Sequence, residues 1–297
     1  MRPKLDLSVA IVICTRNRPA FLKKCLEAIT HLKPMPDEVI VVDNTSGDKE
    51  TEAAARKFSA RYTLEPIAGL SRSRNRGLAE SKSEIVAYLD DDALPTERWL
   101  EFLIEPFADS RVGVVTGRTI LPDSQADDIN EEPTRFLSNK DRLWLEIAAF
   151  GGLGIGTNMA LRKAACTGGK IFDERLGRGT LFQGLEEHHA FVHLLSIGYY
   201  AVHVPAAIVL HRSQKHDDIK EDVCNHIAYS ILLFSEYPSQ RLNLLRFLFR
   251  RARRKPLTWP RDAPDPGEMI SSGWRVLLPA TFRAAIRFLR NRKPKDK

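Results

Sequence analysis

The sequence predicts an α/β fold in which a Rossmann-like, mostly parallel sheet is flanked by helices and followed by a C-terminal helical extension. Three observations predict it. Short β-rich runs alternate with helical patterns over the first 116 residues. These runs are almost continuously apolar, as expected for parallel strands that are covered on both faces. Beyond His216 the apolar periodicity becomes helical, and the residues between the apolar positions become basic.

The first half contains five strand patterns with four helical patterns between them. The strands are predicted at residues 9–14, 38–43, 61–66, 84–90 and 112–117. The helices are predicted at residues 19–31, 48–58, 70–81 and 96–107, with Pro19 in the first turn of the first helix. In a sheet of this kind the ligand crevice lies outside the carboxyl ends of the strands.

The second half alternates less regularly. Residues 117–155 are predicted to be irregular, with an acidic centre, and residues 156–162 to form a strand that enters a short helix. A long helix is predicted from Leu185 to Ile197, because Gly198 is a typical helix stop. Two short strands are predicted at residues 199–205 and 207–212.

The composition is that of a globular protein. Hydrophobic residues make up 43% of the 297 residues and charged residues 28%, which excludes wholesale disorder and fibrous classes. The four cysteines form no C-x-x-C pair and fit a reducing compartment. No signal-peptide pattern is present, and the longest apolar run, residues 194–210, is short for the roughly 20 residues that span a bilayer. We expect a cytoplasmic protein without a transmembrane helix.

Positive charge is concentrated near the C-terminus. The formal net charge of the chain is +7, but residues 236–297 hold 16 Lys and Arg against 5 Asp and Glu. The remainder of the chain is therefore slightly acidic. This asymmetry predicts an anionic partner for the C-terminal segment alone.

Polar segments follow three of the predicted strands. They are T-R-N-R after residue 14, D-N-T-S-G-D from residue 43 and D-D-D-A-L-P from residue 90. Because the carboxyl ends of parallel strands meet at one edge of a sheet, we expect these segments to converge on a binding site.

Asp90, Asp91 and Asp92 lie where a buried strand leaves the sheet. Three adjacent carboxylates repel one another, and Mg²⁺ or Mn²⁺ bound to a diphosphate would remove that repulsion. A solvated turn before Pro95 is the alternative. The position beside two other polar strand ends favours the metal site.

Two further groups could contact a nucleotide. Asp43, beside Asn44, can accept a hydrogen bond from a base or ribose, although an Asx turn would also explain it. In the predicted third helix Arg72 and Arg76 share a face, whereas Arg74 points elsewhere and could reach phosphates or a base. Simple solvation is the alternative for these arginines.

The order of these segments resembles that of the family 2 glycosyltransferases, which have the GT-A fold. The resemblance covers residues 8 to about 213 and rests on TRNRP, DNTSGD, GLSRSRNRG, YLDDDALP, GTNMALR, residues 172–191 and LHR. It implies a nucleotide-sugar donor (UDP, dTDP or GDP), Mg²⁺ or Mn²⁺, and an inverting single displacement by a hydroxyl of a glycan or lipid-linked acceptor. It also implies a catalytic domain over residues 1–215, with a nucleotide-binding half to about residue 116 and an acceptor half at 117–215, before a basic helical extension at 216–297.

The resemblance implies roles for individual residues. Those expected to bind the substrates are Thr15, Arg16, Asp43, Arg74, Asn75, Asp90 and Asp91. Asp90 and Asp92 match the outer members of the D-x-D motif, with Asp92 as the metal ligand. His211 matches the histidine that completes the metal shell.

The chain departs from the family at the start of the long second-half helix, where Glu186-Glu187 replaces the usual Glu-Asp. By position Glu187 is the general base and Glu186 its acidic neighbour. Glutamate is about one methylene longer than aspartate, so either the acceptor sits differently or the roles within the pair shift. A positioned carboxylate base accelerates such a step by roughly 10²–10⁴-fold, and a neighbouring carboxylate can raise its pKa.

Two other patterns have simpler interpretations. His188, His189 and His193 lack the H-E-x-x-H spacing and a third ligand, so helix-surface histidines beside the acceptor cleft are favoured over a zinc site. The glycines of residues 151–156 lack P-loop spacing and predict flexible backbone near the acceptor or donor sugar.

Other functions stay open as alternatives. A sugar-1-phosphate nucleotidyltransferase would carry a Gly-rich loop after the first strand, and TRNRP has no glycine. A non-catalytic nucleotide-sugar-binding or membrane scaffold protein would not need the metal carboxylates, the acidic pair and His211 together. No nucleic-acid recognition motif accompanies the basic tail. The sequence does not select the sugar, the nucleotide or the acceptor.

The C-terminal segment is predicted to bind an anionic membrane face, as in cell-envelope polysaccharide enzymes, without spanning it. Its apolar residues among the basic ones are Leu242, Leu245, Phe247, Leu248 and Phe249. A second basic amphipathic pattern covers residues 278–290. Such helices can lie in the headgroup region. Packing of the apolar stripes on the catalytic domain or a partner subunit is the alternative.

Overall fold

The computed structural model describes residues 7–44, 47, 49–122, 132–180, 182–211 and 219–252. Its strands are β1 (Val9–Thr15), β2 (Glu38–Asn44), β3 (Arg61–Glu65), β4 (Ile85–Asp90), β5 (Ala93–Pro95), β6 (Val112–Ile120), β7 (Arg135–Leu137), β8 (Asn158–Arg162) and β9 (Tyr200–His211). Its α-helices are α1 (Pro19–Ile29), α2 (Lys49–Lys57), α3 (Leu70–Glu80), α4 (Trp99–Ile104), α5 (Trp144–Ala149), α6 (Glu186–Ser196), α7 (Ile219–Glu236) and α8 (Arg241–Ala252). The predicted elements of the first half are all present.

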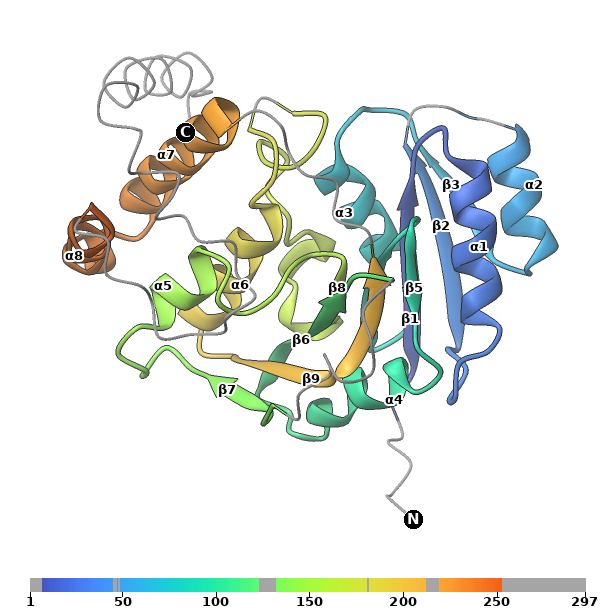
Figure 1. The fold of residues 1–297 in the computed structure, drawn as a ribbon, viewed down its shortest axis with the longest axis horizontal. Coiled ribbons are helices and arrows are strands. Elements are labelled where there is room, and N and C mark those ends of the chain that lie inside the picture. Colours follow the sequence, from blue (N-terminus) through green and yellow to red (C-terminus); the bar gives the residue numbers. More distant parts are fainter. Residues whose placement is uncertain are drawn as a thin grey trace.

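One mixed sheet organises the molecule (Figure 1). Its strand order is β3-β2-β1-β4-β8-β6-β9-β5, and β7 pairs with β9. The first four strands are parallel, whereas β8 runs antiparallel to both β4 and β6. In the register, Thr15 pairs with Asp43 and Cys14 with Asp90, so the ends of β1, β2 and β4 lie at one edge. The predicted convergence of the polar strand ends is therefore confirmed.

Strand alternation divides the core between the two faces of the sheet. In β1, Ala10 and Val12 belong to the cluster beneath α3, α5 and α6, whereas Ile11 and Ile13 belong to the cluster beneath α1, α2 and α4. All four side chains are fully buried. Since successive side chains of a strand point to opposite faces, a strand that is apolar at every position must be covered on both sides. Figure 1 shows α1 and α2 on one side of β1 and β2 and α3 on the other.

The structure differs from the sequence prediction in two segments of the second half. Residues 117–155 are not wholly irregular, because they include the short strand β7 and the helix α5, whose six residues are all buried. The two strands predicted around Pro205 form the single strand β9, and its pairing with β6 shifts register after Gly117. Proline has no N–H to donate to the ladder. A Cβ at Gly117 would lie 2.1 Å from the carbonyl oxygen of Ala207, so only glycine fits at this irregularity.

The first C-terminal helices are part of the main core. Tyr229 and Leu233 of α7 and Leu244 of α8 are buried in the cluster that includes α5 and α6, and Phe247 of α8 is also buried. The ring of Phe247 stacks on Phe150 with 4.3 Å between centroids. The first part of the predicted helical extension therefore packs on the preceding part of the chain, and the domain boundary at residue 215 stays a prediction. The second amphipathic pattern, at residues 278–290, lies outside the described residues.

The sequence also predicts that the chain has no transmembrane helix. Within the described ranges, which leave out residues 253–297, no helix combines the length and apolarity that crossing a membrane requires.

Candidate active site

A cavity of about 700 Å³ opens at the carboxyl edge of β1 and β4. Seven of the residues expected at the site line it: Thr15, Arg16, Arg74, Asp90, Glu186, Glu187 and His211. They come from the ends of β1, β4 and β9, from the second turn of α3 and from the first turn of α6. Residues of the predicted nucleotide-binding half and of the predicted acceptor half of the chain therefore line one cavity.

The D-x-D carboxylates and His211 form a compact cluster. One ligand atom from each of Asp90, Asp92 and His211 lies within 4.8 Å of the others. Nε2 of His211 lies 3.0 Å from Oδ1 of Asp92, because β5 pairs Ala93 with His211 and so brings the two strand ends together. Two carboxylates and an imidazole beside an open cavity suit Mg²⁺ or, with the nitrogen ligand, Mn²⁺.

The charges around Asp92 favour its ionised form. Burial alone would raise the pKa of Asp92, but the hydrogen bond with His211 and the charge of Arg18 outweigh it and hold that pKa at about 2. Nη1 of Arg18 donates to Oδ2 of Asp92 at 2.8 Å. The same pairing raises the pKa of His211, mainly through the hydrogen bond with Asp92. A metal ligand that is already a carboxylate at neutral pH loses no proton on binding.

Asp91, the central carboxylate, points away from the cavity. It is fully buried and accepts a hydrogen bond of 2.6 Å from Oγ1 of Thr15. Nη2 of Arg18 lies 2.5 Å from its Oδ1. Burial raises the pKa of Asp91 to about 6. In the structure Asp91 ties the end of β1 and the turn after it to the end of β4, and its expected contact with substrate stays a prediction.

The buried side chain of Arg74 lies between Glu186 and Asp90. Its Nη1 donates to Oε1 of Glu186 at 2.7 Å, and its Nη2 lies 3.6 Å from Oδ1 of Asp90. Gly156 packs directly on the guanidinium, since a Cβ there would lie 2.6 Å from Nη2. Arg72 and Arg76 instead pair with surface glutamates. The prediction that Arg74 faces away from its two neighbours is confirmed.

The acidic pair lies in the first turn of α6, at a strained entry to the helix. Leu185 precedes the helix with φ of +69°, in the left-handed region that β-carbon-bearing residues rarely adopt. Such strain persists where the surroundings require it and is common at functional sites. It turns Glu186 and Glu187 toward the cavity, where the N–H of Gly156 donates to Oε1 of Glu187 at 3.3 Å.

The two glutamates have different environments. Burial, and secondarily the charge of Glu187, raise the pKa of Glu186 to about 7. Burial acts in the same direction on Glu187, but His188, Arg74 and the N–H of Gly156 outweigh it and hold the pKa of Glu187 below its usual range. Oε2 of Glu187 has no hydrogen-bond partner within the described part of the chain. Oε2 of Glu186 has none either, so the lowered pKa is what distinguishes Glu187, and its role as the base stays a prediction.

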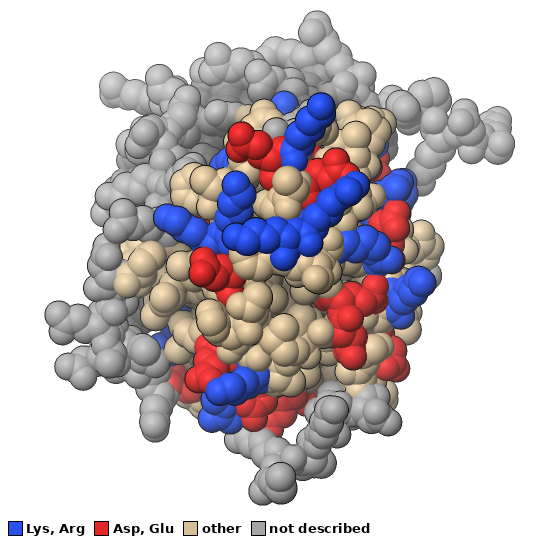
Figure 2. Space-filling view, turned by 90° about the vertical axis from the view of Figure 1, so that its right-hand side faces the viewer, with Lys and Arg blue, Asp and Glu red and all other residues tan. Residues whose placement is uncertain are grey.

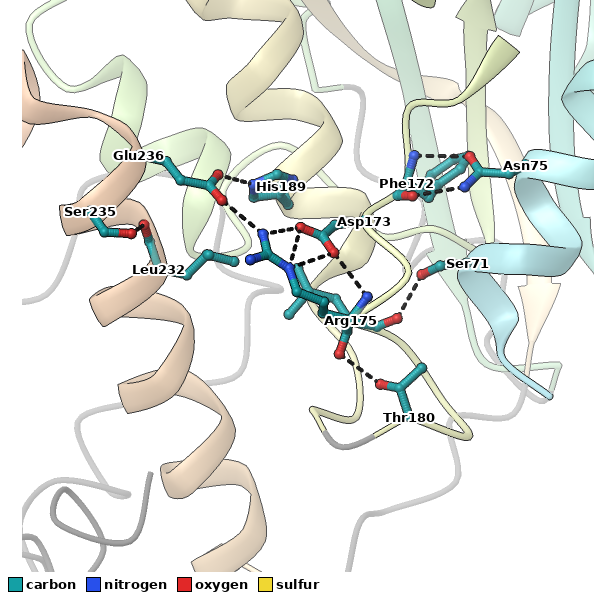
Figure 3. Close-up of polar contacts among 11 residues, drawn as sticks. Ser71, Asn75, Phe172, Asp173, Arg175, Thr180, His189, Leu232, Ser235 and Glu236 are labelled. Atoms are coloured by element: carbon teal, nitrogen blue, oxygen red, sulfur yellow. Dashed lines mark hydrogen bonds and ion pairs between the residues drawn. The ribbon is translucent and has the colours of Figure 1, made fainter. Parts of the chain in front are cut away.

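Two expected contacts lie away from the cavity. The amide of Asn75 bonds to the backbone of Ile171 and Phe172, with Nδ2 2.8 Å from the carbonyl oxygen of Phe172 (Figure 3). Asp43 is fully buried and accepts a hydrogen bond of 2.9 Å from the hydroxyl of Tyr62. Neither residue lines the cavity, so their contacts with the donor stay predictions.

Several residues of the site were not singled out from the sequence. Arg18 and Thr157 hold the D-x-D carboxylates, and the Thr157 hydroxyl donates to Oδ2 of Asp90 at 2.7 Å. Exposed Arg178 lines the cavity from a loop with positive φ at Gly177 and Gly179. The run G-R-G was the available signal for Arg178. Thr157 had none, because its partner is 67 residues away.

The histidines of α6 are placed differently from the prediction. His188 and His189 are buried and not at the helix surface, because this face of α6 is covered by other parts of the chain. Nε2 of His189 lies 2.9 Å from Oε2 of Glu236 at the end of α7 (Figure 3). Asp173, His189 and Glu236 approach one another closely enough for a metal, but Arg175 bridges both carboxylates. The cluster is an ion-pair network that joins α7 to the loop before α6.

Comparison with known proteins identifies the family. Residues 10–167, more than half of the chain, match the description "Glycosyl transferase family 2". The chain belongs to glycosyl transferase family 2. Glycosyltransferase AglE of Haloferax volcanii is 36% identical over 118 residues, which cover 37% of this chain and 38% of AglE. The chain therefore matches well under half of the length of this curated relative.

Solved structures of the GT-A fold resemble this family 2 chain over nearly its whole length. The mannosyltransferase PcManGT of Pyrobaculum calidifontis, in complex with GDP-Man and Mn²⁺, is 18% identical with a TM-score of 0.61, and the match covers 98% of this chain and 89% of that one. TarS 1–349 of S. aureus, in complex with UDP-GlcNAc, is 15% identical with a TM-score of 0.63, covering 96% and 81%. At these identities the likeness shows the fold, which confirms the predicted GT-A architecture.

Proposed function

We propose that the chain is an inverting glycosyltransferase that moves a sugar from a nucleoside-diphosphate donor to an acceptor hydroxyl. One observation carries the proposal. Glu187, whose pKa is lowered and whose Oε2 has no hydrogen-bond partner in the described part of the chain, lines the same cavity as Asp90 and His211, which cluster with Asp92. A base on one side and a cation-binding group on the other are the two parts that a single displacement requires.

Glu187 supplies the base in this mechanism. Oε1 is held by the N–H of Gly156, which leaves Oε2 to accept the proton of the attacking hydroxyl. The acceptor oxygen bonds to the anomeric carbon while the bond from that carbon to the donor phosphate breaks. The electron pair of that bond leaves with the nucleoside diphosphate. Glu186 is paired with Arg74 and positions the first turn of α6.

The opposite side of the cavity carries groups that fit the diphosphate. Asp90, Asp92 and His211 would hold a divalent cation, which supplies charge neutralisation of the departing diphosphate when it is bound. The exposed side chains of Arg16 and Arg178 line the same cavity and add positive charge for phosphate oxygens. Arg74 contributes less to the diphosphate, because two carboxylates already surround it.

The complexes of similar proteins support the donor class. PcManGT holds GDP-Man with Mn²⁺, and TarS holds UDP-GlcNAc. For this chain we propose a UDP-, dTDP- or GDP-sugar with Mn²⁺ or Mg²⁺, and a glycan or lipid-linked acceptor of cell-envelope type. We further propose that transfer takes place in the cytoplasm, with the C-terminal segment in peripheral contact with the membrane.

Replacement of Glu187 tests the mechanism. Glu187→Gln keeps the size of the side chain and removes the base, so transfer should fall by at least about 100-fold while donor binding stays close to that of the unchanged protein. Glu186→Gln is the matched control, since it differs by one position in the same helical turn. A larger loss in the control would exchange the two roles, and near-normal transfer by both variants would refute a carboxylate base.

The donor can be identified without a known acceptor. Thermal unfolding is measured with UDP, dTDP and GDP and their sugars, each with and without Mn²⁺. A ligand that binds only the folded state raises the unfolding temperature by an amount set by its concentration relative to Kd. Metal-dependent stabilisation by one nucleotide is expected. No stabilisation by any of them would contradict a nucleotide-sugar donor.

A further inference from the structure

The helix α8 has two apolar stripes, and only one of them packs on the protein. Leu244 and Phe247 are 1% and 4% exposed and belong to the main core. Leu242, Leu245 and Leu248 are 57%, 52% and 42% exposed. Residues three apart are neighbours on a helix surface, so these leucines form one outward stripe. We call Leu242, Leu245 and Leu248 the outer stripe.

The outer stripe is not explained by packing within the described part of the chain. A surface helix of a globular protein normally turns one apolar face inward and a polar face outward. Here the inward face is already supplied by Leu244 and Phe247, and the ring of Phe247 stacks on Phe150, the residue that follows α5. Neighbouring exposed apolar side chains usually mark an interaction site.

Basic side chains surround the outer stripe. Arg241 and Arg246 are both exposed on α8. Nε of Arg241 donates to the carbonyl oxygen of Phe234 at 2.9 Å, and its guanidinium lies 5.1 Å from the ring of that half-exposed phenylalanine. Residues 236–297 carry 16 Lys and Arg against 5 Asp and Glu. The stripe is thus an apolar patch within a strongly cationic segment.

The opposite end of the molecule has a different surface. Figure 2 shows the side that carries α1 and α2, where a band of Lys and Arg lies close to Asp and Glu side chains. On this side Lys33 pairs with Glu97 and Arg56 with Glu52, both on the surface. Such mixed charge produces no extended field of one sign. The combination of exposed leucines and excess positive charge is found at α8.

We propose that the outer stripe and its arginines dock α8 on an anionic lipid surface. The inference rests on the proposed function in one respect, because it assigns to α8 the peripheral membrane contact that was proposed there for the C-terminal segment. Leucines of a helix that lies in the membrane plane enter the acyl boundary, while arginines reach anionic headgroups. A second copy of the chain is disfavoured as the occupant, because it would bring two strongly positive segments together.

Docking through α8 would hold the catalytic body at the surface. The helix before it, α7, ends at Glu236, which binds Arg175 and His189 (Figure 3). His189 belongs to α6, the helix that begins with the acidic pair. These contacts therefore join α7, the helix before α8, to the helix that carries the base. The surface-bound enzyme keeps one orientation relative to the lipid.

Vesicle flotation of the full chain tests the proposal. The probes are phosphatidylcholine vesicles with and without phosphatidylglycerol, at low and high salt. We expect flotation with the anionic vesicles only. The triple variant Leu242→Ser, Leu245→Ser, Leu248→Ser should bind about 100-fold more weakly, since each leucine buries about half of its apolar surface in the lipid. Arg241→Gln with Arg246→Gln should weaken binding about thirtyfold at low salt and less at high salt.

Two exposed apolar residues far from α8 provide the matched control. Met35 follows α1 and Leu64 belongs to β3, at the end of the molecule opposite α8 (Figure 1). They are 56% and 39% exposed, so Met35→Ser with Leu64→Ser removes a similar kind of surface and should leave flotation unchanged. Metal-dependent binding of a nucleoside diphosphate should be unaffected in every variant. That readout separates the two proposals, because loss of nucleotide binding with normal flotation would count against the function alone.

Three results would overturn the inference. Flotation of the triple serine variant like that of the unchanged chain would assign membrane binding to another segment. Equal flotation with neutral and anionic vesicles would remove the role of charge. Failure of the unchanged chain to float would show that the outer stripe does not bind lipid. If light scattering then finds a dimer that the triple variant converts to a monomer, the stripe binds a second copy of the chain.

Discussion

Replacement of Arg74 by methionine should destabilise the protein strongly. Arg74 is 3% exposed, and its guanidinium is the cation paired with Glu186 at 2.7 Å. Methionine keeps much of the aliphatic length but removes the charge, which leaves a buried carboxylate without its partner. Breaking a buried ion pair on one side costs about 3–5 kcal/mol of unfolding free energy. We expect a loss in that range at neutral pH or above.

The loss should depend on pH, with a sign that the structure sets. The pKa of Glu186 is about 7 in the folded protein, above its ordinary value of 4.5. A carboxyl group with a raised folded pKa stabilises the fold fully below its unfolded pKa and loses that contribution as the pH rises through the folded value. Arg74 lowers the pKa of Glu186, so its removal raises that pKa further. Each added unit costs about 1.4 kcal/mol at high pH.

Urea unfolding at pH 5 and pH 8 measures both effects. The variant should lose more stability at pH 8 than at pH 5, because Glu186 is protonated at the lower pH and needs no partner there. Combining Arg74→Met with Glu186→Gln should restore more than half of the loss, since the two residues form one coupled pair. A destabilisation below about 1 kcal/mol, or one that is equal at both pH values, would refute the buried ion pair as the cause.

The remaining predictions concern the metal, the base and the core. Asp92→Asn should abolish Mn²⁺-dependent binding of the nucleoside diphosphate in calorimetry while the unfolding temperature stays near that of the unchanged protein; retained metal dependence would remove Asp92 from the metal site. With Glu187 as the base, the rate of transfer should fall toward low pH only below about 4.5, since the pKa of Glu187 is lowered from that value. A fall near pH 7 would point to Glu186, whose pKa is about 7. Gly77→Ala should lower the unfolding free energy by about 1–3 kcal/mol, because overpacking a core costs that much and the new Cβ would lie 2.3 Å from Cγ1 of Val12. An unchanged unfolding free energy in chemical denaturation would show that α3 can shift away from β1 without a cost in stability.

The fold of the first half was predictable because its signals are local. Continuous apolar runs, helix starts such as Pro19 and the three aspartates after β4 are each read within about ten residues, and the structure contains the corresponding elements. The antiparallel direction of β8, whose strand was predicted, and the register shift in β9 were not predictable in this way. They depend on contacts such as that of Asn158, whose amide donates to the carbonyl oxygens of Arg118 and Ala207, 40 and 49 residues away.

The same distinction holds for the C-terminal helices. Their amphipathic pattern could be read from the sequence, but the pattern did not say which apolar residues face the protein. Phe247, predicted among the membrane-facing residues, is buried against Phe150, whereas Leu242 and Leu245 face outward. The choice depends on the position of α5, about 100 residues earlier in the chain.

The site shows what each level decides. The sequence by itself selected the candidate carboxylates, because carboxylates at strand ends and a paired glutamate at a helix start have few structural reasons to occur there. Only the tertiary structure decided how the environments of Glu186 and Glu187 differ. Arg74 pairs with Glu186, and Gly156 with Glu187, across more than thirty residues of chain, and each contact lowers the pKa of its glutamate. Burial nevertheless keeps the pKa of Glu186 above its usual value, whereas the pKa of Glu187 lies below it. A pKa depends on burial and on nearby charge, and neither is a property of neighbouring residues in the sequence.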